Sequence, residues 1–153
     1  MSERIYVGAD HAGFALKEKL VDELKQRLVA ELMKLGYEPI DVGPKTLDPA
    51  DDYPDYAKPV ADAVSRGVVQ RGVLTCGAGL GMSFTANRYP HVRAALVWSP
   101  EVAELSRKHN DANVLVLPSR FVSEAEGLEI LHKWLTTKFE GGRHQRRVEK
   151  IDS

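Results

Sequence analysis

A single cysteine lies on a glycine-rich turn and is the strongest candidate for chemistry in this sequence. Cys76 follows a short apolar stretch, Gly72–Thr75, that is typical of a strand. Three glycines come next at every second position: Gly77, Gly79 and Gly81. Such a turn can point successive backbone N–H groups at an oxyanion or phosphate. A helix predicted to begin near Met82 would favour the thiolate, so Cys76 could transfer a proton or attack as a nucleophile, and the alternative is a buried structural cysteine.

Further polar residues follow other predicted strands. Asp10 and His11 come after the first apolar run, and Ser99 comes after the fourth. Ligands of open α/β sheets bind outside the carboxyl ends of the strands, so these residues are expected at the same edge as Cys76. A plain turn with an aspartate helix cap is the alternative for Asp10 and His11.

Histidine and arginine supply two more candidates. His109 and Asn110 end the helix that Ser99 opens, where they could satisfy carbonyls or, for His109, act as a general acid or base. Arg143 and Arg147 follow a Gly-Gly break and lie four residues apart, so on a helix they would share a face and could clamp a phosphate. A solvated basic tail around His144 is the alternative.

Composition narrows the class of protein. The chain has 153 residues, 43% hydrophobic and 28% charged, which suits one domain over residues 1–153. Its net charge of −1 gives no general attraction to nucleic acid or anionic membranes. One cysteine and an N-terminus without a signal sequence favour the cytoplasm. The cysteine and five scattered histidines show no metal spacing, and no dinucleotide or cysteine-phosphatase motif is present, so we expect no metal and no cofactor.

Alternating apolar runs and amphipathic segments predict the elements that position these residues. The pattern is that of an α/β protein with a parallel five-stranded sheet and a C-terminal helical tail. The expected strands contain Ile5–Val7, Pro39–Val42, Val73–Thr75, Ala94–Trp98 and Val114–Leu117. The expected helices are Phe14–Leu35, with a near-duplicated heptad Val21–Arg27, then Tyr53–Arg66, Ser99–Lys108 and Ser123–Phe139, the last opened by a capping box.

Six blocks of the chain together resemble a known family. They are GADHAG (8–13), DYPDYA (52–57), VLTCGAGLG (73–81), ANR (86–88), SRKHNDANVL (106–115) and EGGRHQRRVEKI (140–151). In order and spacing they are similar to the type B ribose-5-phosphate isomerases, which are related to the galactose-6-phosphate and allose-6-phosphate isomerases. The resemblance implies a Rossmann-like three-layer α/β sandwich and a homodimer or homotetramer whose active sites are shared between subunits.

The resemblance also implies a role for each matching position. Cys76 matches the base that moves a proton between C1 and C2 of the sugar through a cis-enediolate, and His109 matches the residue that helps open the furanose ring. Some members use a glutamate early in the next helix instead, but Leu80 and Met82 are apolar here. The substrate contacts implied are Asp10, His11, Tyr53 and Asn110 for the sugar, Gly77, Ala78, Gly79, Leu80 and Gly81 for the anion-binding turn, and Arg120, Arg143 and Arg147 for the phosphate.

We therefore expect a cytoplasmic, metal-independent isomerase that interconverts ribose 5-phosphate and ribulose 5-phosphate, a step of the pentose phosphate pathway. One departure leaves the substrate open: ribose-phosphate members usually carry Thr or Ser where this chain has Ala78. An isomerase of another sugar or of a hexose 6-phosphate is the first alternative. A catalytically silent subunit that binds a sugar phosphate is the second.

Overall fold

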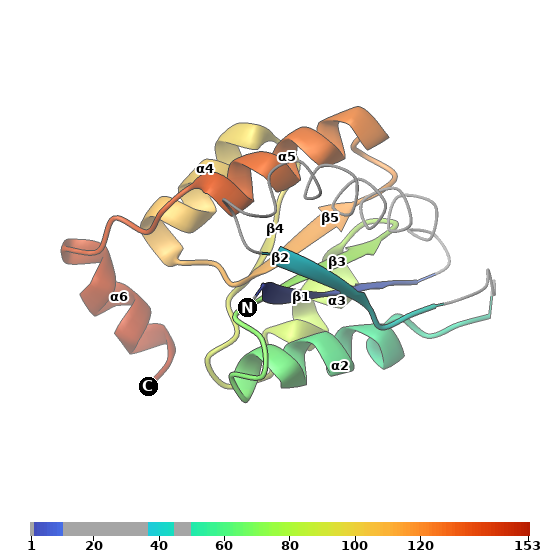
Figure 1. Ribbon diagram of the computed structural model, residues 1–153, viewed down its shortest axis with the longest axis horizontal. Helices are drawn as coiled ribbons and strands as arrows, with labels where there is room; N and C mark the ends of the chain where they lie inside the picture. The colour runs from blue at the N-terminus through green and yellow to red at the C-terminus, as the bar shows by residue number, and fades with distance from the viewer. Residues whose placement is uncertain (1, 11–36, 45–49) are drawn as a thin grey trace.

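The computed structural model describes residues 2–10, 37–44 and 50–153 of the chain (Figure 1). Strands and helices alternate along most of this length. The strands are β1 (Glu3–Ala9), β2 (Tyr37–Asp41), β3 (Arg71–Cys76), β4 (Ala94–Leu96) and β5 (Val114–Pro118), and the helices are α2 (Tyr53–Ser65), α3 (Leu80–Ala86), α4 (Pro100–Asn110), α5 (Glu124–Thr136) and α6 (Arg143–Ile151). The predicted helix 14–35, its heptad 21–27, His11 and residues 45–49 of the polar loop lie outside the described residues.

The five strands form one parallel sheet in the order β2-β1-β3-β5-β4. Strand β2 pairs with one side of β1, and β3 pairs with the other side. Strands β5 and β4 then extend the sheet beyond β3. The strand order therefore reverses between β1 and β3, which is where open α/β sheets bind ligands. In the register of these two strands, Ala9 is opposite Thr75, so Asp10 and Cys76 come next to each other at the carboxyl edge.

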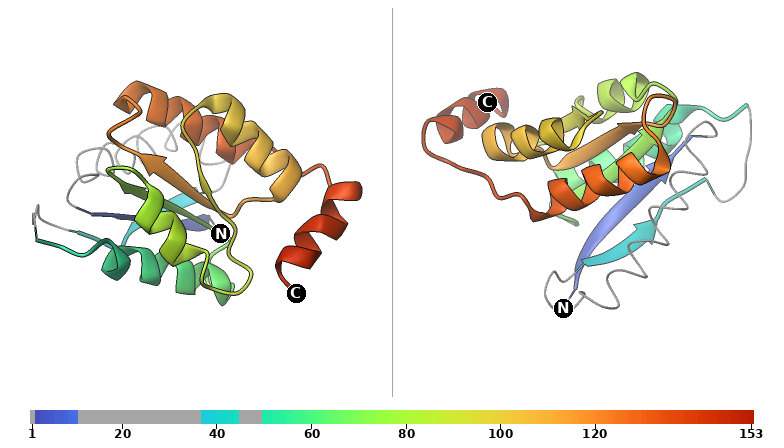
Figure 2. Two further views of the ribbon diagram at one scale, coloured as in Figure 1. Left: turned by 180° about the vertical axis from the view of Figure 1, so that it is seen from behind. Right: turned by 90° about the horizontal axis from the view of Figure 1, so that it is seen from above.

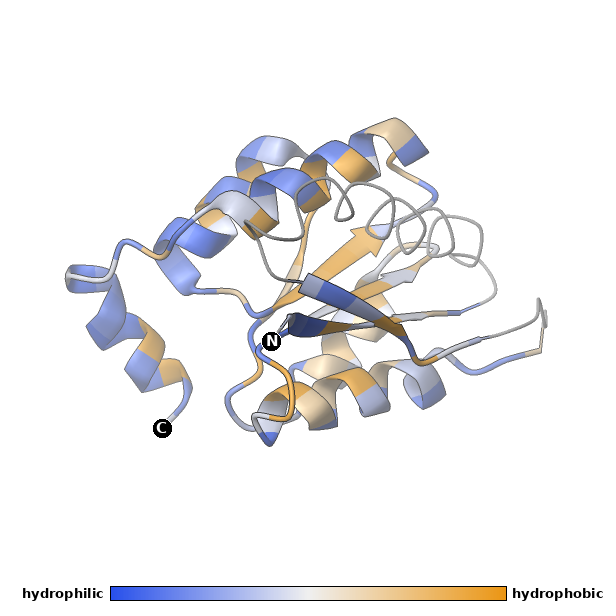
Figure 3. Cartoon of the chain, in the orientation of Figure 1, coloured by the Kyte–Doolittle hydropathy of each residue, from blue (hydrophilic) through white to orange (hydrophobic). Residues whose placement is uncertain are grey.

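Alternating side chains of the strands build two apolar layers, as the three-layer sandwich requires. Leu115 and Leu117 of β5 face the layer of α4 and α5, which contains the fully buried Trp134. Val114 and Val116 face the layer of α2 and α3. Figures 2 and 3 show these helix pairs on opposite faces of a sheet whose central strands are strongly apolar. The predicted α/β fold is confirmed.

Helix termini follow the sequence signals closely. Ser99 accepts a hydrogen bond from the Val102 N–H at the start of α4. Ser123 and Glu126 form the reciprocal capping box of α5, with bonds of 3.2 and 2.7 Å. Helix α5 ends at Thr136, three residues before the predicted Phe139, because Thr137 is already extended. None of the helices in the described part of the chain is both long and apolar enough to cross a membrane.

Candidate active site

Cys76 ends β3 and its thiol lies beneath the glycine turn. The residue is 5% exposed, and the Gly79 N–H donates to its Sγ at 3.1 Å. Its carbonyl accepts hydrogen bonds from the Ser119 N–H at 2.9 Å and from the Ser119 hydroxyl at 3.2 Å, which fix the end of the strand. The sulfur is therefore held in one place, with backbone donors directed at it.

Burial and a nearby carboxylate set the acidity of this thiol. Burial is the largest influence and raises the pKa of Cys76, and the charge of Asp10 raises it further. Hydrogen bonds from the backbone of Met82, Gly79 and Ala78 lower the pKa but do not compensate. The expectation that the helix start alone would make the thiol acidic is therefore corrected. Few Cys76 side chains are therefore ionised at neutral pH, and the backbone donors stabilise the thiolate once it has formed.

Two glycines of the turn lie in close contact with side chains of other elements. Gly79 has a φ of 77°, a left-handed conformation, and a β-carbon there would lie 2.3 Å from Leu96 Cδ1. A β-carbon at Gly81 would lie 2.5 Å from the ring of Tyr53. Helix α3 consequently begins at Leu80, two residues before the predicted start, directly after the left-handed Gly79.

Further candidate residues surround the thiol at the same sheet edge. The Asp10 N–H donates to the Thr75 carbonyl at 3.3 Å, which joins the ends of β1 and β3. Tyr53, at the start of α2, covers Gly81 and is 42% exposed. The exposed Arg120 packs on the other side of the turn, with Nε 2.9 Å from where a Gly77 β-carbon would lie. We call Asp10, Tyr53, Cys76, residues 77–81 and Arg120 the thiol cluster.

A second group of candidates lies near the amino ends of the strands, on the opposite side of the sheet from Cys76. Helix α4 starts at the carboxyl edge, and its 11 residues carry the chain about 16 Å back toward the amino edge. There the Arg93 Nε, just before β4, donates to the Asn110 carbonyl at 3.1 Å. Helix α6 stands against this end of α4, far from the carboxyl ends of the strands (Figure 1). We call His109, Asn110, Glu140, Arg143, His144 and Arg147 the imidazole cluster.

The two arginines of the imidazole cluster are available to a ligand. Arg143 and Arg147 are exposed on α6, and their guanidinium groups form no ion pair with any residue of the described ranges. His144 between them is buried, with its ring stacked on His109. The basic tail is thus a helix with one face anchored by His144 and with its arginines exposed.

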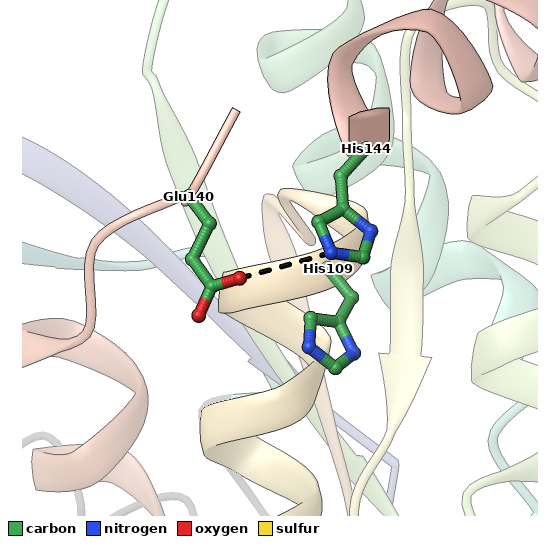
Figure 4. A group of neighbouring side chains, drawn as sticks. All are labelled: His109, Glu140 and His144. Atoms are coloured by element: carbon green, nitrogen blue, oxygen red, sulfur yellow. Dashed lines mark ion pairs between the residues drawn. The ribbon is translucent and has the colours of Figure 1, made fainter. Parts of the chain in front are cut away.

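Sequence reasoning missed the contacts of His144 and Glu140. His109, Glu140 and His144 bring three possible ligand atoms within 4.8 Å of one another (Figure 4). Linear spacing gave no sign of this group, since its members come from two separate segments. The available signal was the position of His144, one helical turn before the apolar Val148 on a mostly charged helix.

Comparison with known proteins gives consistent matches over nearly the whole chain. The family model described as ribose/galactose isomerase matches residues 5–151. A probable ribose-5-phosphate isomerase B of Mycoplasma genitalium is 43% identical over 99% of this chain and 95% of the relative. Ribose-5-phosphate isomerase B of Escherichia coli is 44% identical over 97% of this chain and 94% of the relative.

Solved structures are similar over the same extent. The crystal structure of the Mycoplasma genitalium enzyme with bound ribulose-5-phosphate has a TM-score of 0.91 and 42% identity, covering 99% of this chain and 95% of that one. A ribose 5-phosphate isomerase structure from Thermotoga maritima has a TM-score of 0.87 and 43% identity, covering 99% of both chains.

Proposed function

The chain belongs to the ribose/galactose isomerase family and is a sugar-phosphate aldose–ketose isomerase, and from this premise we propose that it interconverts ribose 5-phosphate and ribulose 5-phosphate. The observation that carries the proposal is the thiol of Cys76, held under backbone donors at the β1–β3 reversal of the sheet. A base and oxyanion donors at one point are what a proton shift beside a carbonyl requires.

In the proposed reaction, the Cys76 thiolate removes the proton from C2 of the open-chain aldose. The C2–H electron pair forms the C1–C2 double bond, and the carbonyl oxygen on C1 gains the negative charge. The resulting cis-enediolate lies against the backbone N–H groups of residues 77–81. The thiol then returns its proton to C1 while the hydroxyl proton moves from O2 to O1, which leaves the ketose. No redox cofactor is needed because the electrons stay within the sugar.

The raised pKa of Cys76 suits this role in one respect and limits it in another. A higher pKa makes the thiolate a stronger base, so each thiolate abstracts a weakly acidic C–H proton more readily. The same shift leaves fewer thiolates at neutral pH. We propose that the bound substrate and the backbone donors of the turn offset this loss, and that a reducing cytoplasm keeps the single cysteine available.

We propose that a second copy of the chain completes each site. The thiol cluster provides the base, the donors and one arginine, whereas ring opening by His109 and two phosphate contacts, Arg143 and Arg147, belong to the imidazole cluster. In one copy these clusters lie at opposite edges of the sheet, so a homodimer with shared sites is the simplest arrangement that unites them. Three exposed aromatic side chains on the carboxyl side support a covered surface there: Phe84, Trp98 and Phe121, at 65%, 59% and 74% exposure.

Initial rates on purified protein test the proposed substrate. Ribose 5-phosphate, allose 6-phosphate, galactose 6-phosphate and unphosphorylated ribose should be compared at equal concentrations. We expect the highest kcat/KM on ribose 5-phosphate and very little activity on ribose, since the phosphate contacts orient the reacting carbons. A preference for a hexose phosphate would support the alternative that Ala78 raises, and binding without any turnover would identify a silent subunit.

A further inference from the structure

His144 is a buried polar side chain on an otherwise exposed helix. Its relative exposure is 6%, and Val148 is the other buried residue among the described positions of α6. Burying an imidazole has a cost unless its polar atoms or its faces find partners. Figure 4 shows what it contacts: its ring stacks on the ring of His109, with centroids 4.4 Å apart and an interplanar angle of 12°.

The same group is tied to the last turn of α4 by the segment before α6. The Glu140 N–H donates to the carbonyl of Lys108, the neighbour of His109, at 3.1 Å. The Glu140 Oε2 lies 3.7 Å from His144 Nε2 (Figure 4). The Glu140 carboxylate therefore lies beside His144, and its own backbone is anchored beside His109.

A metal ion is the other use that three such residues could have. Imidazole nitrogens bind metals through lone pairs in the plane of the ring, so one ion would have to lie in the planes of both histidines. Rings that are stacked and nearly parallel have no such common point nearby. The arrangement of His109 and His144 therefore fits a ring-stacking contact better than the coordination of a metal ion.

Burial and nearby positive charges set the protonation state of His144. Burial lowers the pKa of His144, and the positive charges of His109, Arg143 and Arg147 lower it further, whereas Glu140 acts in the opposite direction. His144 is thus held in its neutral form and presents an uncharged face to its neighbour. The stacking contact is thus made by a neutral ring.

We propose that His144 is a positioning residue that fixes the plane of the His109 imidazole for proton transfer to the ring oxygen of a cyclic sugar phosphate. The inference rests on the proposed function, in which His109 serves ring opening. His144 acts through His109 and does not itself contact the sugar. A ring that is free to rotate would misplace the proton donor, and misplacement by about 1 Å can reduce a rate on the order of a hundredfold.

Two measurements in one direction separate this role from a general loss of structure. Ribulose 5-phosphate has its C5 oxygen esterified and stays open, so exchange of its C1 proton with D2O needs the Cys76 base but no ring chemistry. Net formation of ribose 5-phosphate also needs closure of the furanose ring, the reverse of the opening assigned to His109. We expect His144→Ala to raise the ratio of C1 exchange to net conversion by on the order of tenfold. His132→Ala, an exposed histidine of α5, is the matched control and should change neither value.

A second pair of variants keeps the test decisive should His144→Ala fail to fold. His144→Phe retains a planar ring that can stack, and His144→Leu is also apolar but cannot stack in this way. We expect Phe to keep the wild-type ratio and Leu to shift it, and equal ratios for Phe and Leu would overturn the inference. His109→Ala tests the proposed function separately from the inference about His144. If this variant leaves the ratio unchanged, the ring-opening role of His109 is wrong.

Discussion

The protonation of the Cys76 thiol is determined by influences that act in opposite directions. Burial and Asp10 oppose ionisation, and the backbone of the turn favours it. Replacing Cys76 by Ala should abolish the exchange of the C2 proton with solvent while leaving the binding of ribulose 5-phosphate nearly unchanged, because the proposed phosphate contacts are arginines and not the thiol. Calorimetric titration and proton exchange measure these two properties. Near wild-type turnover in Cys76→Ala would remove the proposed mechanism.

Alkylation of Cys76 should reveal the direction of its pKa shift. Thiolates react with iodoacetamide and thiols do not, so below the pKa the rate rises about tenfold per pH unit. Because the pKa of Cys76 is raised, the rate of inactivation should still be rising at pH 9, whereas that of a free thiol levels off. Saturating substrate should slow it at every pH. A plateau near pH 7 would contradict the raised pKa.

Ala78 is exposed on the turn and carries no hydroxyl that could reach a sugar. Ala78→Thr should raise kcat/KM for ribose 5-phosphate by a modest factor, since one neutral hydrogen bond contributes about 0.5–1.5 kcal/mol. It should lower activity on hexose phosphates because the larger side chain occupies space beside the reacting carbons. Ala78→Ser separates the hydroxyl from the added methyl group. Equal harm to all substrates would make the alanine a packing requirement of this turn.

Helix α6 is anchored at both ends and carries exposed arginines. His144 holds it near its beginning, and at its end Asp152 accepts a hydrogen bond from Arg93 Nη1 at 2.5 Å. Arg93 also donates to the last carbonyls of α4, so both ends of α6 are tied to the helix that carries His109. The anchoring leaves Arg143 and Arg147 pointing outward on a fixed frame.

Arg143→Ala and Arg147→Ala should each raise KM for ribose 5-phosphate. A lost charge-assisted contact to phosphate is worth about 1.5–3 kcal/mol. Arg146→Ala is the matched control. Arg146 is exposed on the same helix, so its replacement removes the same charge, but it does not belong to the imidazole cluster. Steady-state kinetics on all three variants decides the matter: an equal effect at Arg146 would show that only the net charge of the tail counts.

Local signals predicted the elements well, and long-range contacts explain the differences. Ser99 and Ser123 act through bonds within one turn, so the starts of their helices were predicted correctly from sequence. The start of α3 was placed two residues late because Gly79 turns early against Leu96, a residue of another strand. The strand endings likewise predicted that Asp10 and Cys76 meet, since parallel strands share a carboxyl edge.

The sequence could not reveal how the remaining site candidates divide between two edges. His109 and Cys76 looked like partners in one reaction, but the length of α4 separates them within one copy. His144 looked like part of a solvated tail, and its burial depends on a stacking contact with a residue far away along the chain. Such placements follow from tertiary packing, which neither periodicity nor motif spacing records.

Mixing inactive variants tests the proposed sharing of active sites between two copies of the chain. Cys76→Ala damages the thiol cluster, and the double variant Arg143→Ala, Arg147→Ala damages the imidazole cluster. A mixed dimer has one site with both defects and one with none, so random exchange of subunits should restore about a quarter of the wild-type rate. Mixing under refolding conditions allows the exchange. No recovery, with mixed dimers detected by mass spectrometry, would place each site within a single chain.

The proposed sharing of each site between two copies also predicts how the rate depends on protein concentration. A lone copy would hold both sets of groups yet no complete site, so the catalyst itself would form by a bimolecular association. On dilution below the dimer dissociation constant, the rate should then pass from about first order to about second order in protein concentration. Specific activity would then depend on protein concentration and would report the fraction of chains that are in dimers.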